Sequence, residues 1–145
     1  MAIKFNLLVV DDDDGTARML ARSVRSRLGD RFEVTSLTDS AAAMQHCEDH
    51  FCHVLISDLE MPGADGLELM RSAKRRHPWT QVIVVTAHST WDRIASAIEL
   101  GASDYLLKPI DPKELAIILD ETYTRLIRWH LALQSTPSPA AAAMT

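Results

Sequence analysis

The chain has 145 residues, which suits one domain of ordinary size and is too few for two domains with full cores. Hydrophobic residues make up 47% of it and charged residues 24%, the balance of a folded globular protein rather than a disordered chain. The net charge is −5 without a lysine or arginine stripe, and no apolar run could span a bilayer, so neither nucleic acid nor membrane is an expected direct partner.

Short apolar segments predict buried β-strands. Three of them are rich in β-branched residues and show no polar alternation, which is typical of strands covered on both faces, and two are weaker. In chain order, the predicted strands span residues 7–10, 32–37, 54–56, 82–85 and 105–107.

Stretches with helical spacing of apolar residues lie between and after these strands. In chain order, the predicted helices span residues 17–28, 39–50, 66–77, 91–100 and 112–133. Gly29 and Gly101 supply helix stops. The last helix has the clearest start, because Asp111 can cap it, Pro112 fits its first position and Glu114 can complete a capping box.

Strands that alternate with helices of this length imply right-handed crossovers and a doubly wound α/β fold with a parallel sheet. Ligands of such folds bind beyond the carboxyl ends of the strands. Polar residues follow four of the predicted strands: Asp11, Asp12, Ser57, Asp58, Thr86 and Lys108. The topology therefore predicts that these side chains meet at one edge of the sheet.

Three carboxylates that meet there, from Asp11, Asp12 and Asp58, would repel one another unless a cation bound them. A hard divalent ion such as Mg²⁺ prefers oxygen ligands and keeps open coordination positions. Lys108 and Thr86 add an ammonium and a hydroxyl, which together with the metal could stabilise the oxygens of a transferring phosphoryl group. An aspartate can itself act as the nucleophile and form an acyl phosphate.

Four segments in this order resemble the response-regulator receiver domains of two-component signalling, including the chemotaxis regulators. The resemblance covers about residues 5–126, and the segments that carry it are 9–12, 57–66, 85–87 and 101–109. It implies a flavodoxin-like (αβ)5 fold, with a five-stranded parallel sheet in the strand order 2-1-3-4-5.

The resemblance also implies a role for each residue of the acidic site. Asp58 is expected to accept a phosphoryl group from the phosphohistidine of a sensor histidine kinase or phosphotransfer protein. Asp12 is expected to bind Mg²⁺, or Mn²⁺ in its place, directly, and Asp11 largely through water. The backbone carbonyl of Glu60 would complete the metal site. A receiver of this kind catalyses only its own phosphorylation and dephosphorylation.

Further roles concern the response to phosphorylation. Thr86 and Lys108 are expected to bind phosphoryl oxygens, and Tyr105 to be an aromatic switch that turns inward as Thr86 moves. This would switch the surface formed by the fourth helix, fifth strand and fifth helix, which could regulate an output domain or target protein or form a homodimer. The bond before Pro109 is expected to be cis.

Several of these residues also have simpler interpretations. Asp13 and Asp14 suit the start of the first helix as a cap and as negative charges, and Tyr105 could serve packing alone. Glu60 and His88 are expected to flank the phosphoryl group, and we hypothesise that Glu60 places negative charge near Lys108 and alters the acyl-phosphate lifetime.

The segment 46–53 raises the alternative of a structural zinc site, because His46 and His50 lie one helical turn apart with Cys47 and Cys52 close by. The absence of a Cys-x-x-Cys pair and the distance from the predicted active edge disfavour it. The two cysteines are expected to remain thiols in a cytoplasmic protein without a secretion signal.

The end of the chain predicts a domain boundary. Residues 1–134 are expected to form the receiver with an extended last helix, and residues 135–145 a Pro/Ser/Ala-rich tail or linker. Trp129 and Leu133 would lie beyond the sheet, in a dimer contact or in a helix that leads to a following domain.

Two other classes of function remain open from the sequence. A haloacid-dehalogenase-type phosphatase also forms an aspartyl phosphate and needs an acidic residue two positions on, which Glu60 would supply, but the chain has no room for a cap domain. A binding module that keeps only the fold would be expected to lack the acidic pair, the acceptor or the lysine, and all are present.

Overall fold

The computed structural model describes residues 3–63, 65–87 and 90–139. Its strands form one parallel sheet in the order β2-β1-β3-β4-β5, which confirms the expected strand order and the doubly wound fold. The strands are β1 Phe5–Val10, β2 Phe32–Leu37, β3 Val54–Asp58, β4 Gln81–Thr86 and β5 Asp104–Leu107.

Each helix begins at a residue whose side chain accepts a hydrogen bond from a backbone N–H of the first turn, which satisfies a donor that the helix itself leaves unpaired. The helices are α1 Asp14–Leu28, α2 Ser40–Asp49, α3 Gly66–Arg76, α4 Trp91–Glu99 and α5 Pro112–Ser135. Their caps are Asp13, Asp39, Asp65, Thr90 and Asp111. The predicted helices are thus confirmed, with small shifts at their ends.

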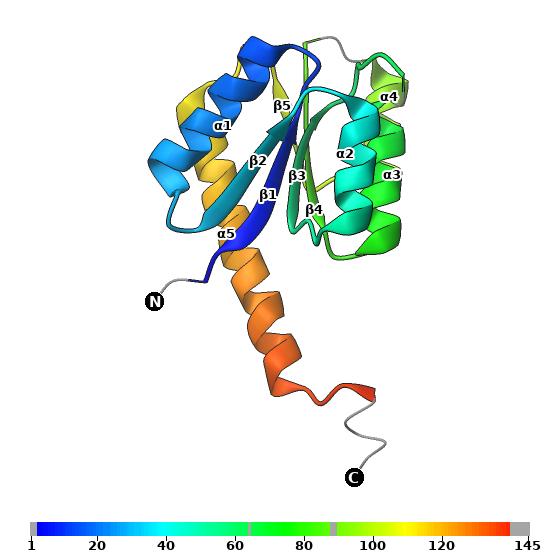
Figure 1. The fold of residues 1–145 in the computed structure, drawn as a ribbon. Helices are drawn as coiled ribbons and strands as arrows, with labels where there is room; N and C mark the ends of the chain where they lie inside the picture. The colour runs from blue at the N-terminus through cyan, green and yellow to red at the C-terminus, as the bar shows by residue number, and fades with distance from the viewer. Residues whose placement is uncertain (1–2, 64, 88–89, 140–145) are drawn as a thin grey trace.

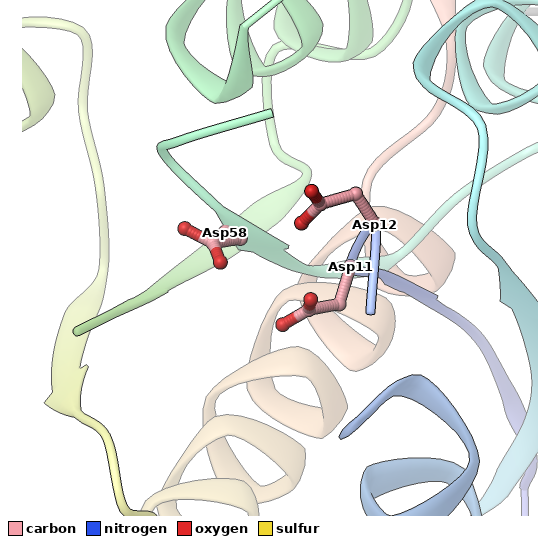
Figure 2. Close-up of side chains that lie close together, drawn as sticks. All are labelled: Asp11, Asp12 and Asp58. Atoms are coloured by element: carbon pink, nitrogen blue, oxygen red, sulfur yellow. The ribbon is translucent and has the colours of Figure 1, made fainter. Parts of the chain in front are cut away.

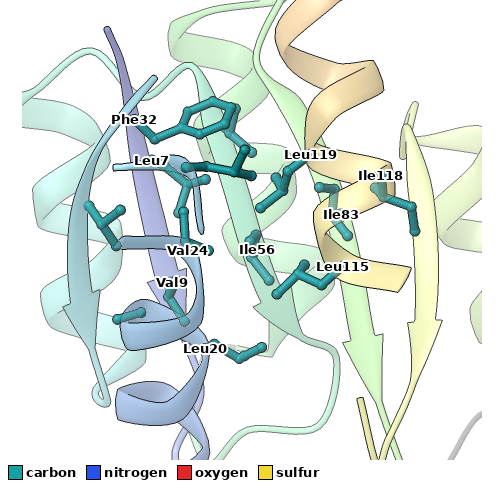
Figure 3. Packing of buried hydrophobic residues seen from close by; sticks show 14 of the residues in the cluster. Leu7, Val9, Leu20, Val24, Phe32, Ile56, Ile83, Leu115, Ile118 and Leu119 are labelled. Atoms are coloured by element: carbon teal, nitrogen blue, oxygen red, sulfur yellow. The ribbon is translucent and has the colours of Figure 1, made fainter. Parts of the chain in front are cut away.

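The helices cover both faces of the sheet (Figure 1). One face packs against α1 and α5, and the other against α2, α3 and α4. Figure 3 shows the first of the two cores, in which Leu20 and Val24 of α1 and Leu115 of α5 meet strand residues such as Val9 and Ile56. Because helices pack against both faces of the sheet, the ends of its strands are held in place.

The strand register brings the carboxyl ends of the strands to one edge of the sheet, which we call the carboxyl edge. Val10 pairs with Ser57, so that Asp11 follows β1 beside the end of β3. Asp58 pairs with Val85 of β4. Because β4 and β5 also end side by side, the predicted meeting of the polar residues at one edge is confirmed by the topology.

Two backbone features shape the loops before and after β5. The peptide bond between Lys108 and Pro109 is cis, as expected. Gly101 ends α4 with a φ of 93°, a left-handed conformation that favours glycine.

The last helix extends beyond the sheet at the amino ends of the strands (Figure 1). It ends at Ser135, two residues after the predicted end. Among the described residues, no helix combines the length and the apolar character that crossing a membrane requires.

Candidate functional site

An acidic cluster lies at the carboxyl edge (Figure 2). Asp11 and Asp12 follow β1, and Asp58 is the last residue of β3. One carboxylate oxygen from each of the three lies within 4.8 Å of the others. Asp11 and Asp58 are 1% and 5% exposed, whereas Asp12 is exposed. The cluster is therefore buried at two of its residues and open to solvent at the third.

Lys108 holds its ammonium between two of these carboxylates. Its Nζ lies 2.6 Å from Oδ2 of Asp11 and 2.7 Å from Oδ2 of Asp58. Burial alone would lower the pKa of the Lys108 ammonium, but the two contacts raise it above its ordinary value. Burial raises the pKa of the Asp11 carboxyl even though Lys108 opposes this. The charge of the Asp11 carboxylate is therefore disfavoured mainly by burial, and Lys108 offsets this only in part.

The donor atoms of the cluster fit Mg²⁺. They are all carboxylate oxygens, the ligands that this hard ion prefers. Oδ2 of Asp11 is buried, and the Lys108 ammonium contacts it at 2.6 Å as an ion pair. One ammonium shared by two of the three carboxylates leaves further carboxylate oxygens for a bound divalent ion, which would offset their remaining negative charge.

The four consecutive aspartates divide between two roles, as the simpler interpretation of Asp13 predicted. The side chain of Asp13 caps α1, accepting hydrogen bonds from the backbone N–H and the hydroxyl of Thr16, which lower the pKa of the Asp13 carboxyl. The backbone N–H of Asp13 donates to Oδ1 of Asp11 at 2.9 Å. The start of α1 thus orients one carboxylate of the cluster.

Thr86 and Tyr105 lie on the strands next to the cluster. Thr86 is fully buried at the end of β4, beside the strand that ends in Asp58. The ring of Tyr105 packs against the core under α4, and its hydroxyl oxygen is buried without a hydrogen-bond partner among the residues that the structure describes. A cavity between α4 and β5 lies next to this ring.

Glu60 makes a different contact from the one expected. Its carboxylate pairs with Arg93 of α4, at 2.9 Å between Oε1 and Nε, rather than with Lys108. Its backbone N–H donates to Oδ1 of Asp58 at 2.9 Å. The expected role of its carbonyl in metal binding stays a prediction, and His88, the other residue expected to flank the site, lies outside the described residues.

Arg93 is a residue that sequence reasoning missed. Besides the ion pair with Glu60, its Nη2 donates to the carbonyl oxygen of Leu59 at 2.9 Å. No local pattern marks it, because it lies in an ordinary amphipathic helix and the Leu59 carbonyl that it contacts is 34 residues away in the chain. Only the packing of α4 beside the β3–α3 loop reveals the contact.

The second candidate metal site, a zinc site at 46–53, finds no support. His46 and His50 stack on each other with ring centroids 4.4 Å apart. Cys47 and Cys52 are free, buried thiols. Within the described residues, the acidic cluster is the one group of three or more candidate ligands close enough to share an ion.

The sequence matches known proteins along most of its length. Residues 7–120 match the family model of the response regulator receiver domain. The DNA-binding transcriptional regulator NtrC of Escherichia coli K12 is 38% identical over 112 residues, which are 77% of this chain and 23% of that protein. NtrC of Proteus hauseri is 34% identical over 94% of this chain and 27% of its own length. The chain thus spans about a quarter of the curated relatives it matches.

Solved structures agree with this likeness. The receiver domain of the Francisella response regulator 1452 has a TM-score of 0.73 at 27% identity, with 85% of this chain and 99% of that one covered. A response regulator receiver domain protein from Clostridium thermocellum has a TM-score of 0.78 at 24% identity, with 86% and 98% covered. The second comparison bears on the fold alone.

Proposed function

The chain belongs to the family of response-regulator receiver domains, and on this premise we propose that Asp58 is its phosphoacceptor. A carboxylate oxygen of Asp58 attacks the phosphorus of a phosphohistidine on a sensor histidine kinase or phosphotransfer protein. The phosphorus–nitrogen bond breaks, a phosphorus–oxygen bond forms, and the histidine ring keeps the electron pair. Phosphorylation on aspartate is general for this family, so the proposal concerns which aspartate reacts and with what help.

The proposed metal site consists of Asp12, Asp11, Asp58 and the backbone carbonyl of Glu60. A bound Mg²⁺, or Mn²⁺ in its place, would neutralise charge that develops on the phosphoryl oxygens. The protein side chains do the remaining work. Lys108 and the hydroxyl of Thr86 bind phosphoryl oxygens, and the buried wall around Asp58 limits the access of water to the acyl phosphate.

One observation carries the proposal. The Lys108 ammonium lies 2.7 Å from Oδ2 of Asp58 while the carboxylates of Asp11 and Asp12 lie close by on the same edge. A purely structural lysine would be satisfied by one carboxylate and would not need an acidic cluster open to solvent. An acceptor with a cation on one side and metal ligands on the other is suited to receiving a phosphoryl group.

Incubation with acetyl phosphate and Mg²⁺, followed by intact mass measurement under acidic conditions, tests the proposal. The wild type is expected to gain one phosphoryl group, with acetate as the leaving group, and Asp58→Asn to gain none. Asp14→Asn, which changes an exposed aspartate of α1, is the matched control and should be labelled like the wild type. Labelling of Asp58→Asn to the wild-type extent would refute the assignment, and multiple turnover of a generic phosphate ester would favour the phosphatase alternative.

We further propose that phosphorylation changes the surface of α4, β5 and α5, with Thr86 and Tyr105 as the switch residues. The buried Tyr105 hydroxyl, which has no hydrogen-bond partner among the described residues, and the adjacent cavity support a ring that has more than one arrangement. This surface would contact an output domain or target protein, or a second copy of the chain. Exposed aliphatic side chains on all three elements support a role of this surface in protein binding: Ile98, Leu107 and Ile117.

The remaining parts of the proposal concern the whole chain. Residues 1–134 would form the receiver and residues 135–145 a tail or linker. The location would be cytoplasmic, where kinases of this signalling type present their phosphohistidine. Direct binding of nucleic acid is not part of the proposal, because the name of NtrC as a DNA-binding regulator describes a protein about four times as long as the matched region.

A further inference from the structure

Arg93 connects the first turn of α4 to the loop that follows Asp58. Its Nη2 donates to the carbonyl oxygen of Leu59 at 2.9 Å, and its Nε lies 2.9 Å from Oε1 of Glu60. Its Nη1 lies 3.6 Å from Oδ2 of Asp65, the cap of α3. The Arg93 side chain is only 27% exposed. A guanidinium whose three nitrogens all face one loop is fixed in place, unlike a solvated surface arginine.

The peptide group between Leu59 and Glu60 joins Arg93 to the acceptor carboxylate. Its carbonyl oxygen accepts from Arg93, and its N–H, which belongs to Glu60, donates to Oδ1 of Asp58 at 2.9 Å. Because a peptide group is planar and rigid, a rotation that alters one of these contacts also alters the other. The charge of the guanidinium also polarises the peptide and strengthens its N–H as a donor.

The same peptide is anchored from α3. The N–H of Gly66 donates to the carbonyl oxygen of Leu59 at 3.1 Å. A Cβ on Gly66 would lie 2.1 Å from the backbone oxygen of Asp58, so the loop passes too close to α3 to shift freely. With the loop held by α3, movement of α4 acts on the Leu59–Glu60 peptide through Arg93 rather than displacing the whole loop.

We propose that Arg93 is a positioning residue that couples α4 to the Asp58 carboxylate through the Leu59–Glu60 peptide. The inference rests on the proposed function of Asp58. Phosphorylation changes what Oδ1 of Asp58 accepts, the peptide responds, and Arg93 transmits the change to the first turn of α4. Since linkage between equilibria is reciprocal, a partner that binds one arrangement of α4 more tightly also shifts the phosphorylation equilibrium of Asp58.

The contact with the Leu59 carbonyl, and not the ion pair with Glu60, carries this coupling. The Glu60 side chain is 52% exposed, and an exposed ion pair contributes little. The carbonyl contact is a charge-assisted hydrogen bond to the very group that holds Asp58. Loss of the Glu60 carboxylate should therefore matter less than loss of the Arg93 guanidinium.

The first measurement is the initial rate of acyl-phosphate formation from acetyl phosphate at saturating Mg²⁺. Arg93→Gln is expected to lower this rate about three- to tenfold. Glu60→Gln keeps the backbone carbonyl of the proposed metal site and the peptide contact, so it should lower the rate less than Arg93→Gln does. Arg128→Gln, which removes an exposed guanidinium of α5, is the matched control and should leave the rate unchanged. Arg93→Lys keeps the positive charge but lacks the branched guanidinium. Its initial rate should lie between those of the wild type and Arg93→Gln.

The second measurement separates coupling from a merely structural role. Amide hydrogen exchange of residues 91–99 is followed with and without acetyl phosphate, at matched extents of phosphorylation. In the wild type, phosphorylation should change the exchange of this segment, and in Arg93→Gln the change should be lost. Residues 14–28 of α1 serve as an internal reference, and a loss of protection there would report unfolding instead.

Equal rates and equal exchange responses in the wild type and Arg93→Gln would overturn the inference. A Glu60→Gln variant as slow as Arg93→Gln would also overturn it, since the ion pair would then carry the effect. Failure of the wild type itself to be labelled at Asp58 would instead count against the proposed function, so the two failures are distinguishable.

Discussion

At the scale of single residues, the site depends on a cation held between two carboxylates. Lys108 contacts both Asp11 and Asp58, and Asp11 is almost completely buried. Without the ammonium, the two carboxylates would face each other in a poorly solvated place, and one of them would have to be protonated or bind a metal ion. The stability of the metal-free protein should therefore depend on this one side chain.

We expect Lys108→Gln to lower the free energy of unfolding by about 2–3 kcal/mol in the presence of EDTA. Saturating Mg²⁺ should restore part of this loss, because a bound cation neutralises the same carboxylates. Urea unfolding with EDTA and with Mg²⁺ measures both effects. Lys113→Gln, an exposed lysine of α5, is the control and should change the stability by less than about 0.5 kcal/mol. If Mg²⁺ restored none of the stability lost by Lys108→Gln, neutralisation of the carboxylates would not be the cause of that loss.

A second residue, Gly66, fixes the loop after Asp58 by its lack of a side chain. A Cβ there would lie 2.1 Å from the Asp58 backbone oxygen and 2.7 Å from Cα of Leu59, both backbone atoms that cannot move aside alone. Gly66→Ala should therefore destabilise the fold by about 2 kcal/mol or more. It should also weaken Mg²⁺ binding, as measured by the rise in thermal midpoint on adding the ion.

Gly15→Ala provides the comparison. The nearest atom to a Cβ on Gly15 is a side-chain oxygen of Asp13 at 3.5 Å, an ordinary contact. In the first turn of α1 an alanine should be neutral or stabilising by up to about 1 kcal/mol. Equal effects of the two glycine substitutions would show that the close approach at Gly66 is relieved by a small backbone shift.

At the scale of elements, the sequence predicted every strand and helix of the described fold. The apolar runs predicted strand centres but not their ends, because polar residues such as Ser57 and Asp58 extend β3 to the edge of the sheet. The chemistry of the edge was predictable because strand ends are local features. Arg93 was not, because its partners depend on how α4 packs against a distant loop.

The surface of α4, β5 and α5 carries exposed aliphatic side chains, of which Ile98 is 67% exposed. If phosphorylation forms the proposed homodimer through this surface, a charge at Ile98 should prevent it without affecting the fold. Phosphorylated wild type is expected to sediment as a dimer in analytical ultracentrifugation, and phosphorylated Ile98→Asp as a monomer.

Leu131→Asp is the control for this prediction, since Leu131 is 53% exposed but lies in the C-terminal part of α5, after the last buried residue of that helix, Leu126. It should dimerise like the wild type. If Leu131→Asp abolished the dimer and Ile98→Asp did not, the dimer contact would lie on the C-terminal part of α5. The proposed surface would then be wrong.

At the scale of the whole molecule, the two edges of the sheet differ in their titratable groups. The carboxyl edge holds the acidic cluster, whereas the opposite edge holds His53 just before β3, with aromatic rings around it. Nδ1 of His53 accepts a hydrogen bond from the backbone N–H of Asn6 at 3.0 Å. Burial, with the nearby His77 and His130, lowers the pKa of His53 to about 4.

This pKa predicts a loss of stability in acid. Above pH 6.5, His53 is neutral in both the folded and the unfolded chain and has no effect. Between pH 6.5 and about 4 the unfolded chain binds the proton and the folded chain does not, so stability falls as the pH falls. Allowing for solvent screening, we expect this residue to contribute about 1–2 kcal/mol of the loss.

Urea unfolding of the wild type and of His53→Gln at pH 7.5, 6 and 4.5 measures this contribution. Glutamine can keep the acceptor for Asn6 but does not titrate, so the variant should lose less stability than the wild type over this range. The raised pKa of Asp11 acts in the opposite direction in both proteins and cancels in the comparison. Parallel pH profiles for the two proteins would contradict the prediction.

The length and placement of α5 have a mechanical consequence. The helix begins four residues after Lys108, beside the acidic edge, and its 24 residues continue past the far edge of the sheet (Figure 1). At 1.5 Å per residue it is about 36 Å long, so a tilt of about 5° at its first turn would displace its last turn by about 3 Å. A small tilt of this helix near Lys108 would therefore become a larger displacement at its C-terminal end, beyond the sheet.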